Sequence, residues 1–267
     1  MDNAPTASGA VPPKKQNLDS ATKLVKDGWA IYKNDFKTYL GIALLAGLGV
    51  YLIGIANIIH PEESSANLPV VWIPFVIIAG LVYIVMILWG SVALIYKASH
   101  SSEPVTLSQA FGSAKGKVWP VFWAGVLTAL VTFAGFILVI IPGIIVGVWL
   151  TFTSYVVVIE GLRGVAALKR SRYYVKGYWW QVWGRLVAIG IIIGLPVGII
   201  GLIVQAILGK ALGTLVSDII SLFAYPLGII TTYLLYKNIV QIKSEQTSPN
   251  VPISVPQPSP EMPNLIT

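Results

Sequence analysis

Six long stretches with very little charge constrain the fold of this chain more than any other feature. The first, residues 38–59, offers roughly 20 uncharged residues, enough for a helix to cross a ~30 Å hydrocarbon core. Comparable stretches follow at 68 or 69–96, 119–141, 143–159, 182–208 and 214–236. With 55% hydrophobic and 11% charged residues, the chain lacks the charge to cover a water-soluble globule. The sequence therefore predicts an all-α, polytopic membrane bundle of six transmembrane helices.

The distribution of positive charge predicts how this bundle is oriented. Of the 18 Lys and Arg residues, only Lys210 falls on the opposite side of a six-span arrangement from the others. By the positive-inside rule, both termini then lie in the cytoplasm, and we expect the cytoplasmic membrane of a bacterium or archaeon. The expected parts are a disordered tail (1–17), the membrane domain (18–241) and a disordered Pro- and Ser-rich tail (242–267).

Three shorter segments have the periodicity of amphipathic helices. One begins at Asp19, a residue suited to capping a helix, and a second follows the capping-box spacing of Thr106 and Gln109. The third is 164–180, where Lys169, Arg172 and Lys176 follow one stripe, and apolar and aromatic residues follow the other. We expect all three to lie at the cytoplasmic membrane interface.

These segments also indicate a threefold repeat, each unit being an amphipathic helix followed by two spans. Lys33, Lys115 and Lys176 align, and each precedes Asn or Gly, residues that tolerate left-handed backbone geometry at a helix end. The alternative is that any juxtamembrane segment carries Lys and aromatic residues, and few identities support the repeat.

Composition excludes several kinds of chemistry. The chain has no cysteine and only two isolated histidines, which excludes thiolate sites and argues against a metal centre; no cofactor is expected. A net charge of +7 would suit nucleic acid only if a soluble basic face were separable, and none is. Anionic membrane lipid is the expected partner, and a membrane-protein partner or a homo-oligomer is left open.

The strongest candidate site is a basic cluster that enters the fifth span. We define the basic cluster as Lys169, Arg170, Arg172, Lys176 and Arg185. Such a cluster can hold phospholipid headgroups, with Trp179 and Trp180 at the glycerol level and Arg185 reaching the headgroups from one turn inside the span. The alternative is that these charges only determine topology.

Two carboxylates lie at the ends of spans. Glu160 is expected to pair with Arg163 at the interface, the alternative being a proton or substrate route. Asp218 is expected to pair with Lys210 or to line an outer vestibule. Because the two acids lie at opposite ends of the bundle, they cannot form a catalytic pair, and we expect no enzymatic activity.

Glycine and proline mark turns, contacts or breaks in the spans. The pair Pro142-Gly143 is expected to turn the chain between the third and fourth spans. Small residues at four-residue spacing on the fifth span predict close helix packing, and prolines on the last two spans offer the alternative of broken helices that bind a solute. The residues concerned are Gly190, Gly194, Pro196, Gly198 and Pro226.

A set of short motifs resembles a known membrane family. The motifs are Ile141-Pro142-Gly143, Trp149, 158–161 (Val-Ile-Glu-Gly), 166–171 (Ala-Ala-Leu-Lys-Arg-Ser) and 176–179 (Lys-Gly-Tyr-Trp). Together they resemble the membrane domain associated with glycerophosphoryl diester phosphodiesterases, and related polytopic proteins of unknown function. The resemblance implies a six-helix membrane domain over roughly 18–241. It does not imply phosphodiesterase activity, which belongs to a separate barrel domain with metal-binding carboxylates and paired histidines. The two histidines of this chain, His60 and His100, are expected on opposite faces of the membrane.

Two functions follow from these features. The first is a non-enzymatic multi-pass protein that binds or organises lipid for membrane or envelope homeostasis. The second is a small permease or channel with a site between the fifth and sixth spans.

Overall fold

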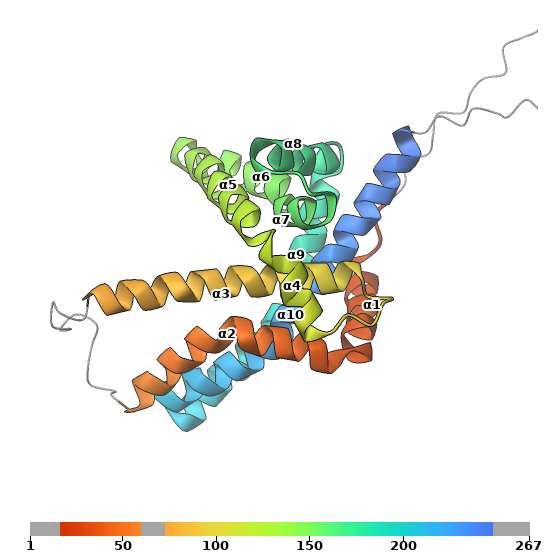
Figure 1. Ribbon diagram of the computed structural model, residues 1–267. Helices are drawn as coiled ribbons and strands as arrows, with labels where there is room; N and C mark the ends of the chain where they lie inside the picture. Colours follow the sequence, from red (N-terminus) through yellow and green to blue (C-terminus); the bar gives the residue numbers. More distant parts are fainter. Residues whose placement is uncertain (1–16, 60–72, 248–267) are drawn as a thin grey trace, which may run out of the picture.

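A computed structural model describes residues 17–59 and 73–247, and every regular element in these two ranges is a helix (Figure 1). The elements are α1 (Ala21–Asn34), α2 (Phe36–Ile59), α3 (Ile73–Ser99), α4 (Leu107–Lys115), α5 (Val118–Leu138), α6 (Ile140–Leu150), α7 (Thr153–Tyr155), the π-helix η3 (Val156–Glu160), α8 (Gly164–Val175), α9 (Trp179–Leu208) and α10 (Lys210–Thr247). The expected all-α class is confirmed.

Five helical stretches are long and apolar enough to cross a membrane. They are Gly80–Ser99, Val118–Ile137, Ile140–Glu160, Trp179–Leu208 and Leu212–Gln246. The third of these joins α6, α7 and η3 into one stretch of 21 residues. Much of their surface consists of exposed large apolar side chains, which only a lipid environment accommodates. The protein is therefore a helical membrane protein.

The order of the helices has a threefold pattern. A short helix precedes two long apolar stretches in each unit: α1 before α2 and α3, α4 before α5 and the α6–η3 stretch, and α8 before α9 and α10. The junctions do not share the left-handed geometry expected of them. Gly177 has a φ of 88°, but Gly116 is right-handed at −74° and Asn34 is the last residue of α1.

The short helices bury their apolar stripes against other helices. In α1 the buried residues are Leu24, Gly28 and Tyr32, and a Cβ on Gly28 would lie 2.8 Å from Thr231 Oγ1 of α10. Figure 1 shows α10 running past α1 and α2. The expected capping box of α4 is present between Thr106 and Gln109. The apolar stripes of α1 and α4 are thus covered by protein.

The turn between α5 and α6 lies at Val139 and not at Pro142-Gly143 as expected. Val139 is extended, with φ −168° and ψ 155°. Pro142 stands in the first turn of α6, where a helix does not need the N–H that proline lacks. Gly143 is buried, and a Cβ there would lie 2.5 Å from the Phe136 ring, so this glycine allows α5 and α6 to pack closely.

The last two helices are continuous, so the alternative of broken helices at the prolines is wrong. Pro196 lies inside α9 and Pro226 inside α10, and both helices extend on either side. Residues 242–247, expected to begin the C-terminal tail, form the end of α10. The other residues of both expected tails, 1–16 and 248–267, lie outside the described residues.

Candidate functional site

Helix α8 places the first three cations of the basic cluster on its outer side because its other side is fixed to the bundle. Ser171 is fully buried; its Oγ donates to Trp149 O at 2.7 Å and accepts from Phe152 N at 3.2 Å. Ala167 and Tyr174 are buried on the same side. Helical periodicity therefore leaves Lys169, Arg170 and Arg172 exposed, followed by exposed Lys176.

The cations of α8 differ in how they are held. The guanidinium of Arg172 lies 4.3 Å from the centre of the Trp149 ring, within the range of a cation–π contact. Arg170 is bound by an ion pair with Glu160. In the described parts of the chain, the ammonium groups of Lys169 and Lys176 make no ion pair or hydrogen bond. Lys169, Arg172 and Lys176 thus face outward without a carboxylate partner among the described residues, so they are able to bind an anion.

A tryptophan group begins α9 directly after these cations. Trp179 Nε1 donates to Ile145 O of α6 at 3.2 Å, which ties the start of α9 to α6. The rings of Trp179 and Trp180 pack at 4.7 Å and 89°, and the Trp180 side chain is 73% exposed. An indole this exposed is favourable at the headgroup level of a membrane.

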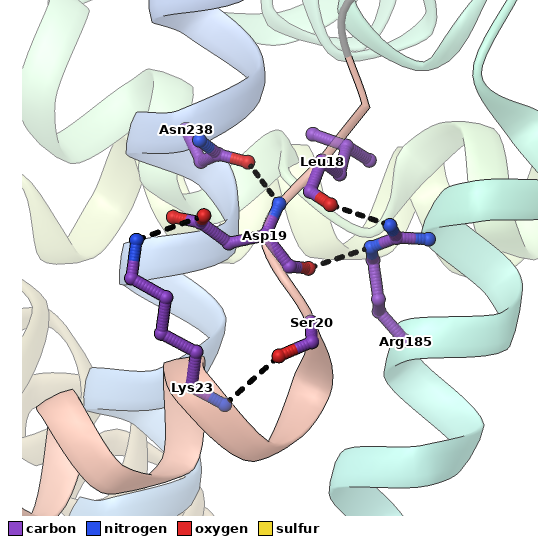
Figure 2. Close-up of polar contacts among 6 residues, drawn as sticks. All are labelled: Leu18, Asp19, Ser20, Lys23, Arg185 and Asn238. Atoms are coloured by element: carbon purple, nitrogen blue, oxygen red, sulfur yellow. Dashed lines mark hydrogen bonds and ion pairs between the residues drawn. The ribbon is translucent and has the colours of Figure 1, made fainter.

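Arg185 has a different role from the one expected. Figure 2 shows its guanidinium turned toward the chain that precedes α1, where it donates to Asp19 O at 2.8 Å and Leu18 O at 2.6 Å. It also donates to Gln181 O at 3.0 Å, and the N–H of Asp19 donates to Asn238 Oδ1 of α10. With three backbone carbonyls bound, Arg185 anchors residues 18 and 19, just before α1, between α9 and α10, and it does not reach toward headgroups.

The segment before α1 also shows that the expected helix cap, Asp19, is wrong. The N-cap of α1 is Ser20, whose Oγ accepts from Lys23 N at 3.3 Å. The carboxylate of Asp19 instead pairs with Lys23 Nζ at 2.9 Å (Figure 2). Helix α1 begins at Ala21, so Asp19 lies one residue too early to cap it, and its backbone is bound to α9 and α10.

Glu160 is bound by residues that are distant in sequence. Its carboxylate pairs with Arg170 at 2.8 Å and accepts from the hydroxyls of Tyr174 at 2.8 Å and Tyr236 at 2.6 Å. The expected pair with Arg163 is wrong: Arg163 is the N-cap of α8. Burial and the nearby carboxylate together raise the pKa of Tyr174 to about 12, so this tyrosine stays a hydrogen-bond donor at neutral pH.

The left-handed residue that ends the π-helix explains why Glu160 does not pair with Arg163. Gly161 has a φ of 73°, which ends the helix directly after Glu160, so Arg163 no longer follows at helical spacing. Lys117 Nζ donates to Val158 O at 2.7 Å and satisfies one of the carbonyls that the end of the helix leaves open.

A further ion pair joins two parts of the first unit, the junction of α1 with α2 and the end of α3. Lys97 of α3 is 1% exposed and its Nζ lies 2.5 Å from Asp35 Oδ2, while the Thr38 hydroxyl donates to the other carboxylate oxygen at 2.7 Å. Desolvation opposes ionisation of Asp35, but the hydrogen bonds from Lys97 and Thr38 outweigh it and lower the pKa of this carboxyl. The sequence identified Lys97 only as a cytoplasmic charge, since burial of a lysine is not visible in a charge pattern.

A cavity of about 570 Å³ lies between α9 and α10, which we call the α9–α10 cavity. Gly190, Gly194 and Gly228 line it. A Cβ built on Gly190, Gly194 or Gly198 would meet no atom within 4 Å, so the expected close packing through this stripe is wrong. The two helices approach nearer their connection, where a Cβ on Gly201 would lie 3.3 Å from Ser217 Oγ.

A second cavity of about 190 Å³ lies among α2, α3 and α10, and Asp218 lines it. We call it the Asp218 cavity. Within 17–59 and 73–247, no ion pair joins Asp218 to Lys210. The expected outer anchor is therefore absent from this part of the chain, and the carboxylate belongs to a cavity.

Comparison with known proteins gives no family assignment. No family model matches the chain, and neither does any curated protein or solved structure. The function must therefore be argued from the geometry alone.

Proposed function

We propose that this protein is a non-enzymatic multi-pass membrane protein that binds anionic phospholipid headgroups at its basic cluster. The observation that carries the proposal is the outward face of α8, where Lys169, Arg172 and Lys176 are exposed beside the exposed indole of Trp180. Cations near an anionic leaflet contribute about 1 kcal/mol each, and tryptophan favours the adjacent headgroup level. A role in membrane or envelope homeostasis follows from this activity.

The topology that we propose has six spans, with both termini in the cytoplasm. Its support is the composition of α2, a 24-residue apolar helix, in addition to the five stretches of membrane-spanning length. With six spans, α1, α4 and α8 share the cytoplasmic side with the basic cluster. Kinship with the membrane domain associated with glycerophosphoryl diester phosphodiesterases is part of this proposal.

Lipid retention in native mass spectrometry tests the headgroup site. We expect the triple variant Lys169→Gln, Arg172→Gln and Lys176→Gln to lose about 3 kcal/mol of attraction, or on the order of a hundredfold in affinity for phosphatidylglycerol. The matched control carries the same number of neutral substitutions on exposed lysines of α1 and the first turn of α2. These control positions are Lys26, Lys33 and Lys37. Equal retention by the triple variant and the unmodified protein, or an equal loss in the control, would contradict the proposal.

A second function, a small permease, is favoured by the α9–α10 cavity. The cavity is mostly apolar, with the hydroxyls of Ser221 and Thr232 among its lining. Leucine at Gly190 would project into it, because Gly190 lines the cavity and a Cβ there meets no atom within 4 Å. Protein-dependent glycerol flux in proteoliposomes that Gly190→Leu abolishes, and that the basic-cluster variant leaves unchanged, would favour this function over the first.

A further inference from the structure

The Asp218 cavity combines a carboxylate with two aromatic side chains at membrane depth. Asp218, Ser221 and Tyr225 of α10 line it together with Tyr83 of α3, and small or aliphatic side chains form the other walls. Ser221 and Tyr225 also line the α9–α10 cavity, so α10 separates the two spaces. The basic cluster belongs to neither.

The packing of α2 against α3 holds this cavity in shape. A Cβ on Gly49 would lie 2.7 Å from the Tyr83 ring, so the glycine leaves room for that ring against α2. At a second α2–α3 contact, a Cβ on Gly90 would collide with the side chain of Ala46, which lines the cavity. Both contacts fix the distance between α2 and α3 while α10 supplies the carboxylate.

The charge of Asp218 is not compensated by the described residues. No ion pair or hydrogen bond reaches its carboxylate from 17–59 or 73–247. Lys210 stands eight positions earlier, which is about 12 Å along a helix. An unpaired carboxylate within a membrane span is costly, so this charge requires a cation or a proton.

The surroundings of the carboxylate decide between these partners. A proton would neutralise Asp218 but would leave the space beside the carboxylate and the two tyrosine rings without a ligand. A calcium ion takes six to eight oxygen ligands, and the walls here are largely apolar. An organic ammonium ion is matched by one carboxylate and by aromatic faces, which attract it through cation–π contacts. We propose that the Asp218 cavity binds a small organic ammonium ion, with Asp218 as its counter-ion and the rings of Tyr83 and Tyr225 as its walls.

Equilibrium binding of radiolabelled tetramethylammonium to the full chain in maltoside micelles tests this site. At constant ionic strength we expect saturable binding of one ion per chain. Asp218→Asn keeps the shape and removes the charge, and the affinity should fall at least tenfold. Asp27→Asn makes the same change at an exposed carboxylate of α1 and should leave binding unchanged.

A second variant keeps the test decisive if Asp218→Asn fails to fold. Tyr83→Leu retains the carboxylate and removes one aromatic wall, and it should weaken tetramethylammonium several-fold relative to sodium. The inference is overturned if the unmodified protein shows no saturable binding at millimolar tetramethylammonium. It is equally overturned if a folded Asp218→Asn or Tyr83→Leu protein binds as tightly as the unmodified one.

Two kinds of ligand carry such an ammonium group: a free amine and the ethanolamine headgroup of a lipid. Nanodiscs of phosphatidylglycerol with and without phosphatidylethanolamine distinguish them. If the headgroup is the ligand, phosphatidylethanolamine competes and weakens tetramethylammonium binding. If the ligand is a free amine, the two nanodiscs give the same affinity.

Discussion

The ion pair between Lys97 and Asp35 predicts an asymmetric response to charge removal. The Lys97 side chain is 2% exposed and that of Asp35 is 32% exposed. Asp35→Asn leaves a buried ammonium without its counter-ion, which costs about 3–5 kcal/mol of unfolding free energy. Lys97→Met keeps the apolar stem, and the remaining carboxylate still has water and the Thr38 hydroxyl. We expect this variant to cost only about 1–2 kcal/mol.

Unfolding in mixed micelles, titrated with dodecyl sulfate and followed by tryptophan fluorescence, measures these differences. The unfolding free energy of the double variant should be close to that of Lys97→Met. Methionine removes the ammonium that Asp35→Asn alone leaves without a counter-ion. The reasoning is refuted if Lys97→Met is at least as damaging as Asp35→Asn. It is also refuted if the two effects simply add, since residues in contact should couple.

The same pair gives a pH dependence with a defined sign. Because the pKa of Asp35 is lower in the folded protein than its ordinary value of about 3.9, the folded state holds this proton less tightly than the unfolded state. The contribution of the carboxylate is therefore present above about pH 4 and is lost as the pH falls through the folded pKa. Comparison of unfolding midpoints in acid should show this loss in the unmodified protein and not in Asp35→Asn.

Three further predictions test the corrected positions. Glu160→Gln should lower the unfolding free energy by about 1–3 kcal/mol, whereas Arg163→Gln should stay within about 0.5 kcal/mol, measured in the same micelles. Gly143→Ala should cost about 1–3 kcal/mol because of the aromatic ring 2.5 Å from the added carbon, while Gly190→Ala should be neutral or stabilise by up to about 1 kcal/mol. Arg185→Gln should speed hydrogen exchange at the start of α1; unchanged exchange there would contradict the anchoring role.

Local features were predictable from the sequence and tertiary ones were not. The capping box at Thr106 and Gln109 depends on four neighbouring residues, so the pattern identified it correctly. The turn at Val139 was missed because Pro142 reads as a helix breaker, although the first turn of a helix accepts proline. A pattern of residues does not show on which side of a proline the chain turns.

The candidate site shows the same division. Helical periodicity predicted that Lys169, Arg172 and Lys176 would be exposed, and they are. The partners of Glu160 were missed because they lie far along the chain, and those of Arg185 because they are backbone carbonyls. The uncompensated charge of Asp218 was missed for a local reason: Lys210 was expected before the sixth span, but it is the first residue of α10 and lies eight positions from Asp218 on the same helix.

The anchoring of residues 18 and 19 by Arg185 and Asn238 has a consequence for biogenesis. Ribosomes deliver the chain from its beginning, so α1 leaves the exit tunnel long before its binding partners exist. Its docking surface is completed only when α9 and α10 have been synthesised. Helix α1 is thus made well before the surface that it docks on, and it can settle only after α9 and α10 have been synthesised.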